Sequence, residues 1–339
     1  MSVIKTSPKQ INPKLIQHFV ENKYAMKVVA EPVLMTGGTV NAGWQIATRE
    51  SKFVLKVFTV PLEDNRSIQE ELEIYRTLLA SKINAPQVLP SLDGDFTKIS
   101  IEGIQYPTVL MKLENLRRVN PANISDAEIK IIADTIAMMH KALKKHDTQL
   151  QSKEVVIPKG PNTPGNPAVD LHSPNGADLS MPQINKLTLL DKELVKHINT
   201  RYKRGMPLKT SVLHGDLSLG HIQFLDNGST YIFDFSDYTY GPLIWDLATL
   251  LVYFYKEGKV NFSKWIRICR KFLFFYTQTI KLGTEDIDMI VPFVADRLLF
   301  EIRTLNRLSR KENRTVDREG NSHRYELAQY ILDGSALLQ

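Results

Sequence analysis

One segment, residues 214–246, constrains this chain more than any other. It reads HGDLSLGHIQFLDNGSTYIFDFSDYTYGPLIWD and spaces four polar residues among apolar, strand-like runs: Asp216, His221, Asp234 and Asp246. A hairpin that turns at LDNGST is expected to bring the first three together. A carboxylate that orients a hydroxyl and two metal ligands are what phosphoryl transfer from a magnesium nucleotide requires. This joint spacing favours such a site over a chance aspartate at a strand end.

Each polar residue of this segment has a predicted role. Asp216 lies in a tight turn after the strand-like SVLHG, where it could orient or accept the proton of an attacking hydroxyl. Asp234 follows the apolar run YIF and is expected to end a buried strand as a magnesium ligand. His221 is the second candidate metal ligand, and His214 is interpreted as a structural residue packed under the loop.

Composition indicates a globular protein of two domains or lobes. The chain has 339 residues, 43% of them hydrophobic and 24% charged. Its single cysteine, Cys269, excludes an internal disulfide framework and fits a reducing compartment. The N-terminus lacks the apolar run of a signal peptide. The most apolar stretch, 242–255, is shorter than the roughly 20 residues that cross a bilayer. We expect a buried helix there, a cytoplasmic protein and no membrane partner.

The net charge of +6 does not point to a nucleic-acid partner. The basic residues are dispersed, and the one concentration, 303–318, alternates with polar and acidic residues. A solvated helix end and loop is therefore favoured over a nucleic-acid patch. The sequence leaves monomer and homodimer open.

The spacing of apolar residues predicts an α+β chain with a β-rich N-terminal lobe at 1–111, a hinge at 111–113 and a helical C-terminal lobe at 112–339. Turn residues and an N-cap mark the boundaries of the elements in the first lobe. These elements are a helix at 13–24 after Asn12, strands within 26–58, a helix at 67–80, and strand candidates near 87–92 and 97–111.

The C-terminal lobe is expected to begin with a helix at 125–145, which the capping box Ser125–Glu128 opens. Residues 151–183 are rich in Pro, Gly and Asn and are predicted to form a surface insertion or lid. Helix is expected again at 184–202, and the chain from 243 onward reads as mostly helical.

Lys56, in the apolar run FVLKVF, is the candidate phosphate-binding lysine. A lysine between apolar neighbours on a strand is costly to bury unless it is paired. Glu71 on the following helix has the spacing of a kinase glutamate, with Ile74 and Leu78 three and seven residues later. An edge-strand lysine that points to solvent is the alternative, and the downstream segment favours the paired lysine.

A glycine turn between two strands, Gly37-Gly38-Thr39, is the candidate phosphate loop. Glycines allow backbone amides to approach phosphates closely. The turn is neither a Walker loop nor a full kinase glycine loop, and a plain hairpin explains it equally well. Met111, at the expected hinge, is assigned to the nucleotide site with these residues.

Together these motifs resemble the aminoglycoside phosphotransferase and choline kinase-like superfamily. HGDLSLGHI, YIFDF and GPLIWDLATLL follow its usual order, H-G-D-x-x-x-x-N, then I-D-F or I-D-W, then a D-L-A helix start. The resemblance implies a bilobal protein-kinase-like fold, ATP or GTP with Mg²⁺, Asp216 as catalytic base and Asp234 as magnesium ligand. It also implies that Asp246 is a structural carboxylate that anchors the loop and that His140 is a structural histidine.

His221 stands where this superfamily usually carries Asn. The macrolide and the 2-double-prime aminoglycoside phosphotransferases are similar to this chain here, with DLSxxH-like segments. A neutral imidazole nitrogen can replace an amide oxygen as a ligand, although magnesium prefers oxygen. An active kinase is favoured, and the alternative is a pseudokinase that serves as a structural or scaffold protein, as in spore-coat relatives.

A small molecule is the expected substrate. Only eleven residues separate Asp234 from Asp246, so no activation segment is present to bind a protein substrate. From 261 onward thirteen Lys and Arg face ten Asp and Glu, which argues against a strongly cationic antibiotic. An aminoglycoside or macrolide, and an amino-alcohol or sugar metabolite, all stay open. Candidate substrate-wall residues are Asp237, Tyr238, Tyr240, Trp245, Arg297, Glu301 and Arg303.

Overall fold

The computed structural model describes residues 11–35, 41–58, 65–146, 208–256 and 260–312, with scattered positions at 182–200 and at 324 and 327. The predicted glycine loop at 37–39 and, apart from Pro182, the insertion at 151–183 lie outside the described residues.

The chain forms two compact units. Unit 1 comprises Met1–Arg117 and Phe224–Ser236, and unit 2 comprises Arg118–Gln223 and Asp237–Gln339. The lobe boundary at residue 111 stays a prediction. The short segment Phe224–Ser236 leaves the C-terminal half of the sequence to join unit 1.

An antiparallel sheet of six strands forms the body of unit 1. Its order is β1-β2-β3-β6-β4, with β5 also paired to β6. The run expected as one strand near 97–111 is a hairpin, because Glu102 and Gly103 turn the chain with φ of 50° and 80°. The strands are β1 (Val33–Leu34), β2 (Ala42–Ala47), β3 (Lys52–Val57), β4 (Val88–Leu89), β5 (Thr97–Ile101) and β6 (Ile104–Lys112).

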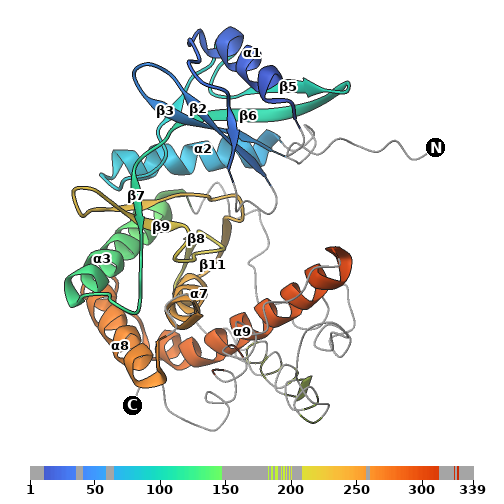
Figure 1. The fold of residues 1–339 in the computed structure, drawn as a ribbon. Coiled ribbons are helices and arrows are strands. Elements are labelled where there is room, and N and C mark those ends of the chain that lie inside the picture. The colour runs from blue at the N-terminus through green and yellow to red at the C-terminus, as the bar shows by residue number, and fades with distance from the viewer. Residues whose placement is uncertain are drawn as a thin grey trace. The chain divides into compact units, whose positions relative to one another are not determined.

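Two helices cover opposite faces of this sheet (Figure 1). Helix α1 (Pro13–Tyr24) begins as predicted, with the Asn12 side chain accepting from the amide of Lys14. It buries Ile16, Val20 and their neighbours in a core shared with β2, β3, β5 and β6. Helix α2 (Asn65–Ala80) matches the expected helix at 67–80.

A second sheet has the order β10-β9-β7 and contains the predicted hairpin. Its strands are β7 (Leu116–Arg118), β9 (Ile222–Leu225) and β10 (Thr230–Ile232). Asn84 ties β10 to the rest of unit 1: its carbonyl accepts from the amide of Ile232 at 3.0 Å, and its side chain donates to the carbonyl of Thr230 at 2.9 Å. The end of β10, and with it Asp234, is thereby fixed within unit 1.

Unit 2 is built from α3 (Asp126–Leu143), α7 (Leu243–Lys256), α8 (Phe262–Thr279) and α9 (Thr284–Glu312). Helix α3 packs on α8, and α7 packs on α9. The predicted capping box is present, with Ser125 and Glu128 bonding each other's backbone amides. Helix α7 is apolar on nearly every side and is buried, as expected for 242–255.

A two-stranded ladder in unit 2 precedes α7. Strand β8 (Thr210–Leu213) pairs antiparallel with β11 (Thr239–Pro242), and Thr239 lies opposite Leu213. Because the Asp216 loop leaves β8 at Leu213, the ladder fixes where that loop begins. Within the residues that the structure describes, no helix is both long and apolar enough to cross a membrane.

We predict that Ser125→Ala lowers the free energy of unfolding by about 1 kcal/mol, because the first turn of α3 loses its N-cap acceptor. Denaturant unfolding followed by circular dichroism measures the change. Ser100→Ala, at an exposed position of β5, is the control. Equal stability of the Ser125 variant and the wild type would contradict the prediction.

Candidate active site

Lys56 lies at the centre of a polar cluster in unit 1. Strand alternation buries Phe53, Leu55 and Val57 on one face of β3, so that Lys56 projects from the other. Its Nζ donates to Glu71 Oε1 at 2.8 Å and to Asp234 Oδ1 at 3.1 Å, and to Ser236 Oγ at 2.8 Å. The predicted lysine, glutamate and metal-binding aspartate thus meet in one cluster.

Glu71 is the buried member of this cluster, with 2% of its surface exposed. Its Oε1 also accepts from the hydroxyl of Tyr75 at 2.6 Å, one turn along α2. That hydroxyl in turn accepts from the backbone amide of Asp234 at 3.2 Å. Two routes of hydrogen bonds therefore connect Glu71 to Asp234, one through Lys56 and one through Tyr75.

Asp234 adopts a left-handed backbone conformation, with φ of 66°. Such a conformation is uncommon for a residue with a side chain, and it concentrates at functional sites. The carboxylate is 42% exposed, and its Oδ1 also accepts from Ser236. A carboxylate that is bound on one side and open to solvent can ligate a cation.

Charge within the cluster controls the ionisation of Lys56. Burial alone would lower the pKa of this lysine, but the charges of Glu71 and Asp234 outweigh burial and raise the pKa above its usual value. Burial and the neighbouring Glu71 raise the pKa of Tyr75 well above its usual range. Lys56 is therefore a permanent cation, as a phosphate-binding residue should be.

The loop after β8 carries Asp216 in unit 2. Gly215 precedes it with φ of 86°, and a Cβ there would lie 1.9 Å from the carbonyl oxygen of Asp237. Only glycine fits this position. The carbonyl of Asp216 accepts from the amide of Ser218 at 2.8 Å, which closes the tight turn expected from the sequence.

The same carbonyl of Asp216 accepts from His221 Nδ1 at 2.8 Å. Because a carbonyl oxygen only accepts, Nδ1 carries the proton, and Nε2 is the basic nitrogen of the neutral ring. The ring stacks on that of His214, with centroids 5.4 Å apart. His221 therefore has the fixed tautomer that an imidazole ligand needs. Asp216 and His221 are brought together in unit 2, whereas Asp234 belongs to unit 1.

Asp246, at the start of α7, accepts hydrogen bonds from the backbone of the Asp216 loop. It is fully buried and accepts from the amides of His214 at 2.7 Å and Gly215 at 3.0 Å. The Nε2–H of His140 donates to the same carboxylate, and the Nδ1 of His140 lies 2.9 Å from the hydroxyl of Tyr276. These bonds fit the structural roles that the family resemblance implies for Asp246 and His140.

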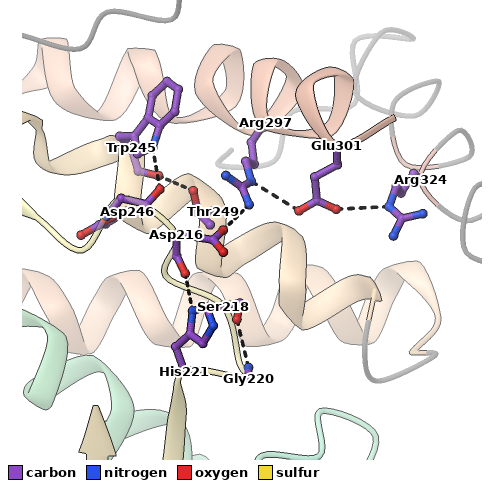
Figure 2. Close-up of polar contacts among 11 residues, drawn as sticks. Asp216, Ser218, Gly220, His221, Trp245, Asp246, Thr249, Arg297, Glu301 and Arg324 are labelled. Atoms are coloured by element: carbon purple, nitrogen blue, oxygen red, sulfur yellow. Dashed lines mark hydrogen bonds and ion pairs between the residues drawn. The ribbon is translucent and has the colours of Figure 1, made fainter. Parts of the chain in front are cut away.

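A line of charged side chains runs from α9 to Asp216 (Figure 2). Arg297 donates to Asp216 Oδ1 at 2.5 Å and to Glu301 Oε1 at 3.3 Å. Arg324 donates to the other oxygen of Glu301 at 3.2 Å. The sequence assigned Arg297 and Glu301 to a substrate wall, but the structure buries both in ion pairs. An Arg–Glu pair four residues apart in the apolar run VADRLLFEI is the signal that could have revealed this.

The other predicted residues that the structure describes take no part in the ion pairs of Lys56 and Arg297. Met111 is the penultimate residue of β6, and its nucleotide role stays a prediction. Tyr238 is buried, Asp237 is exposed, and Tyr240 bonds Thr210 at 2.9 Å. Trp245 donates to the carbonyl of Gly215 at 3.3 Å, which adds support to the Asp216 loop. The side chain of Arg303 lies outside the described residues.

The fold and these residues define a class, the kinase-like phosphotransferases. The aminopropanol kinase associated with a microcompartment is similar over 96% of this chain and 99% of its own, with 15% identity and a TM-score of 0.69. Amicoumacin kinase hAmiN, solved with AMP-PNP, Ca²⁺ and Ami, is similar over 96% and 95%, with 16% identity and a TM-score of 0.68. Choline kinase LicA from Streptococcus pneumoniae is similar over 95% and 98%, with 15% identity and a TM-score of 0.55. The predicted bilobal kinase-like fold is confirmed.

The model of the phosphotransferase enzyme family matches residues 33–264, more than half of the chain. The chain therefore belongs to the phosphotransferase enzyme family, and it is a small-molecule phosphotransferase. This confirms the superfamily that the sequence motifs resemble. No sequence among the curated proteins matches the chain.

We predict that Asp246→Asn destabilises the protein by about 3 kcal/mol at neutral pH, because an amide brings donors to a place where backbone amides need an acceptor. Burial raises the pKa of Asp246, but hydrogen bonding and charge from His140 and His214 outweigh it and hold the pKa below its usual value. The carboxylate therefore stabilises the fold above the ordinary aspartate range, and this stabilisation is lost as pH falls through the lowered pKa.

Urea unfolding across a series of pH values measures this effect. The stability difference between wild type and variant should shrink as the pH falls, since a protonated carboxyl resembles an amide. Asp226→Asn, at an exposed turn position, is the control. A difference that grows toward acid would contradict the prediction.

Proposed function

We propose that this protein transfers the γ-phosphoryl group of ATP or GTP to a hydroxyl of a small molecule. The observation that carries the proposal is the cluster in unit 1, where Lys56 contacts both Glu71 and Asp234. A lysine fixed by a buried glutamate is the arrangement by which kinases hold the α- and β-phosphates. Asp234, at the other end of the lysine, supplies a carboxylate for the metal that accompanies the nucleotide.

The residues fit Mg²⁺ bound with a nucleotide. Across the described residues, no group of three or more His, Cys, Asp or Glu side chains could hold a metal alone. Mg²⁺ typically takes one or two protein ligands and completes its shell with phosphate oxygens and water. Asp234 in unit 1 and the Nε2 of His221 in unit 2 are the ligands we assign. When bound, Mg²⁺ supplies positive charge that neutralises the transferring phosphoryl group.

Asp216 is assigned the role of the carboxylate that orients the accepting hydroxyl and takes its proton. Its loop is rigid, because Asp246 and Trp245 hold the backbone of the preceding residues. A fixed carboxylate suits phosphoryl transfer, which depends on positioning and charge more than on a strong base.

The substrate we propose is a small hydroxyl compound, either an amino-alcohol or sugar metabolite or an antibiotic. The names of the similar structures, an aminopropanol kinase, an amicoumacin kinase and a choline kinase, support this range. A nucleotide-consumption assay against aminoglycosides, macrolides, amino-alcohols and sugars, run with ATP and with GTP, tests the proposal. If no compound is phosphorylated and no nucleotide stabilises the protein against heat, the scaffold alternative is favoured instead.

We predict that Asp216→Ala abolishes phosphoryl transfer, because no other described carboxylate takes the place of its side chain in this loop. Binding of the nucleotide, measured by isothermal titration calorimetry, should be retained because the lysine cluster is intact. Asp226→Ala is the matched control, since it removes an exposed carboxylate from the β9–β10 turn. Wild-type turnover in the Asp216 variant would refute the catalytic assignment.

A second prediction concerns His221. His221→Asn restores the residue usual in the family and should keep activity, whereas His221→Ala should lose about 10- to 100-fold. Imidazole is a better ligand for transition metals than for magnesium. The ratio of the Mn²⁺-supported to the Mg²⁺-supported rate should therefore be higher in the wild type than in His221→Asn. Identical metal ratios in the two proteins would show that His221 does not ligate the metal.

A further inference from the structure

Arg297 is a buried cation in direct contact with the predicted catalytic carboxylate. Its side chain is 8% exposed, and one terminal nitrogen donates to Asp216 Oδ1 while Nε donates to Glu301. The guanidinium also lies over aromatic rings, 5.3 Å from that of Phe300 and 5.9 Å from that of Tyr253. A planar fork that is held by two carboxylates and lies close to two aromatic rings has little freedom to move.

Asp216 contributes a negative charge to this line. Glu301 is 5% exposed and accepts from two buried arginines, Arg297 on one oxygen and Arg324 on the other. Burying a guanidinium group is costly unless carboxylates face it. Two carboxylates face Arg297, those of Glu301 and Asp216. Arg297 is thus bound to the catalytic loop by electrostatics as well as by geometry.

The contact uses only one oxygen of Asp216. Among the described residues, the polar contacts of this side chain are confined to Oδ1, and 32% of the side chain is exposed. An ionised carboxylate has roughly four lone-pair sites on its two oxygens. The second oxygen can therefore accept a hydroxyl while the first stays on the arginine.

We propose that Arg297 is a positioning residue that holds Asp216 by Oδ1, with Glu301 as its anchor, so that Oδ2 meets the accepting hydroxyl. This inference rests on the proposed phosphotransferase function. Arginine stays charged at any working pH, so the contact persists throughout turnover. Because the transfer depends on near-attack geometry, a carboxylate that is free to rotate should slow the chemical step more than it weakens nucleotide binding.

Two arginine variants test the proposal. Arg297→Ala and Arg324→Ala each remove one of the two cations on Glu301, and both residues are buried, but only Arg297 touches Asp216. The full-length proteins are assayed for phosphate release from MgATP, with water as acceptor, and for thermal stability. A purely structural role predicts that both variants lose stability and activity to a similar degree.

A positioning role predicts a split between the two variants. Arg297→Ala should lose about 10- to 100-fold in kcat with KM for MgATP nearly unchanged, whereas Arg324→Ala, which leaves the bond from Arg297 to Asp216 in place, should lose much less kcat. Low millimolar guanidinium chloride should restore part of the kcat of Arg297→Ala by occupying the vacated space, and it should not affect Arg324→Ala. Equal kcat in wild type and Arg297→Ala, or no rescue by guanidinium, would overturn the inference.

Failure of the proposed function can be distinguished from failure of the positioning role. If the wild type phosphorylates no compound of the substrate panel and releases no phosphate from MgATP, the proposed function fails, and this inference fails with it. If Arg297→Ala does not fold, Arg297→Lys carries the test, because lysine keeps the charge but lacks the fork that reaches Asp216 and Glu301 together. Arg297→Lys should then lose kcat while it binds MgATP like the wild type, and an unchanged kcat would refute the positioning role.

Discussion

The buried carboxylate of Asp246 is the group on which the catalytic loop depends. It lies at the first turn of α7 and receives two consecutive backbone amides of the loop, together with His140 from α3. Asp246 is buried, so bulk water does not compete for these bonds, and they hold the backbone of the loop in place. The backbone that leads into Asp216 is held mainly by this group, which also binds the amide of Gly215 at its left-handed conformation.

In both units a cation is shared between two carboxylates at the candidate functional residues. In unit 1 a lysine is shared between buried Glu71 and partly exposed Asp234, and in unit 2 an arginine is shared between buried Glu301 and partly exposed Asp216. In each case the buried carboxylate fixes the cation, and the cation then holds the exposed carboxylate. The reactive group gains a defined position without being buried itself, which would raise the cost of its charge.

Local signals predicted much of this architecture. The cap at Asn12 and the capping box at Ser125 each depend on a few neighbouring residues, and both are confirmed. Glu71 pairs with Lys56, and its role in nucleotide binding stays a prediction. The turn that divides β5 from β6 also had a local signal in Gly103, which was overlooked. Helix α2 shows the limit of periodicity, since Leu79 fits the apolar spacing but is 40% exposed.

Contacts between distant parts of the sequence could not be predicted in this way. Arg297 is 81 residues from Asp216, and no spacing rule relates a helix residue to a loop at that distance. The bond that the amide of Asp234 donates to the Tyr75 hydroxyl likewise joins residues that are far apart in the sequence. The family resemblance supplied the roles of Asp246 and His140 because it carries tertiary information that periodicity lacks. Arg297 has no place in the motif, and neither the motif nor the spacing indicates its bond to Asp216.

The path of the chain through Phe224–Ser236 also limits how the molecule can be divided. A fragment that stopped at Arg117 would contain the whole of the large sheet but would lack the strand that Asn84 bonds and the aspartate that shares Lys56. Its lysine would retain only Glu71, and the polar groups of Asn84 would face solvent. Unit 1 is thus not a module that gene fusion or truncation could transfer, because its last residues follow about half of unit 2 in the sequence.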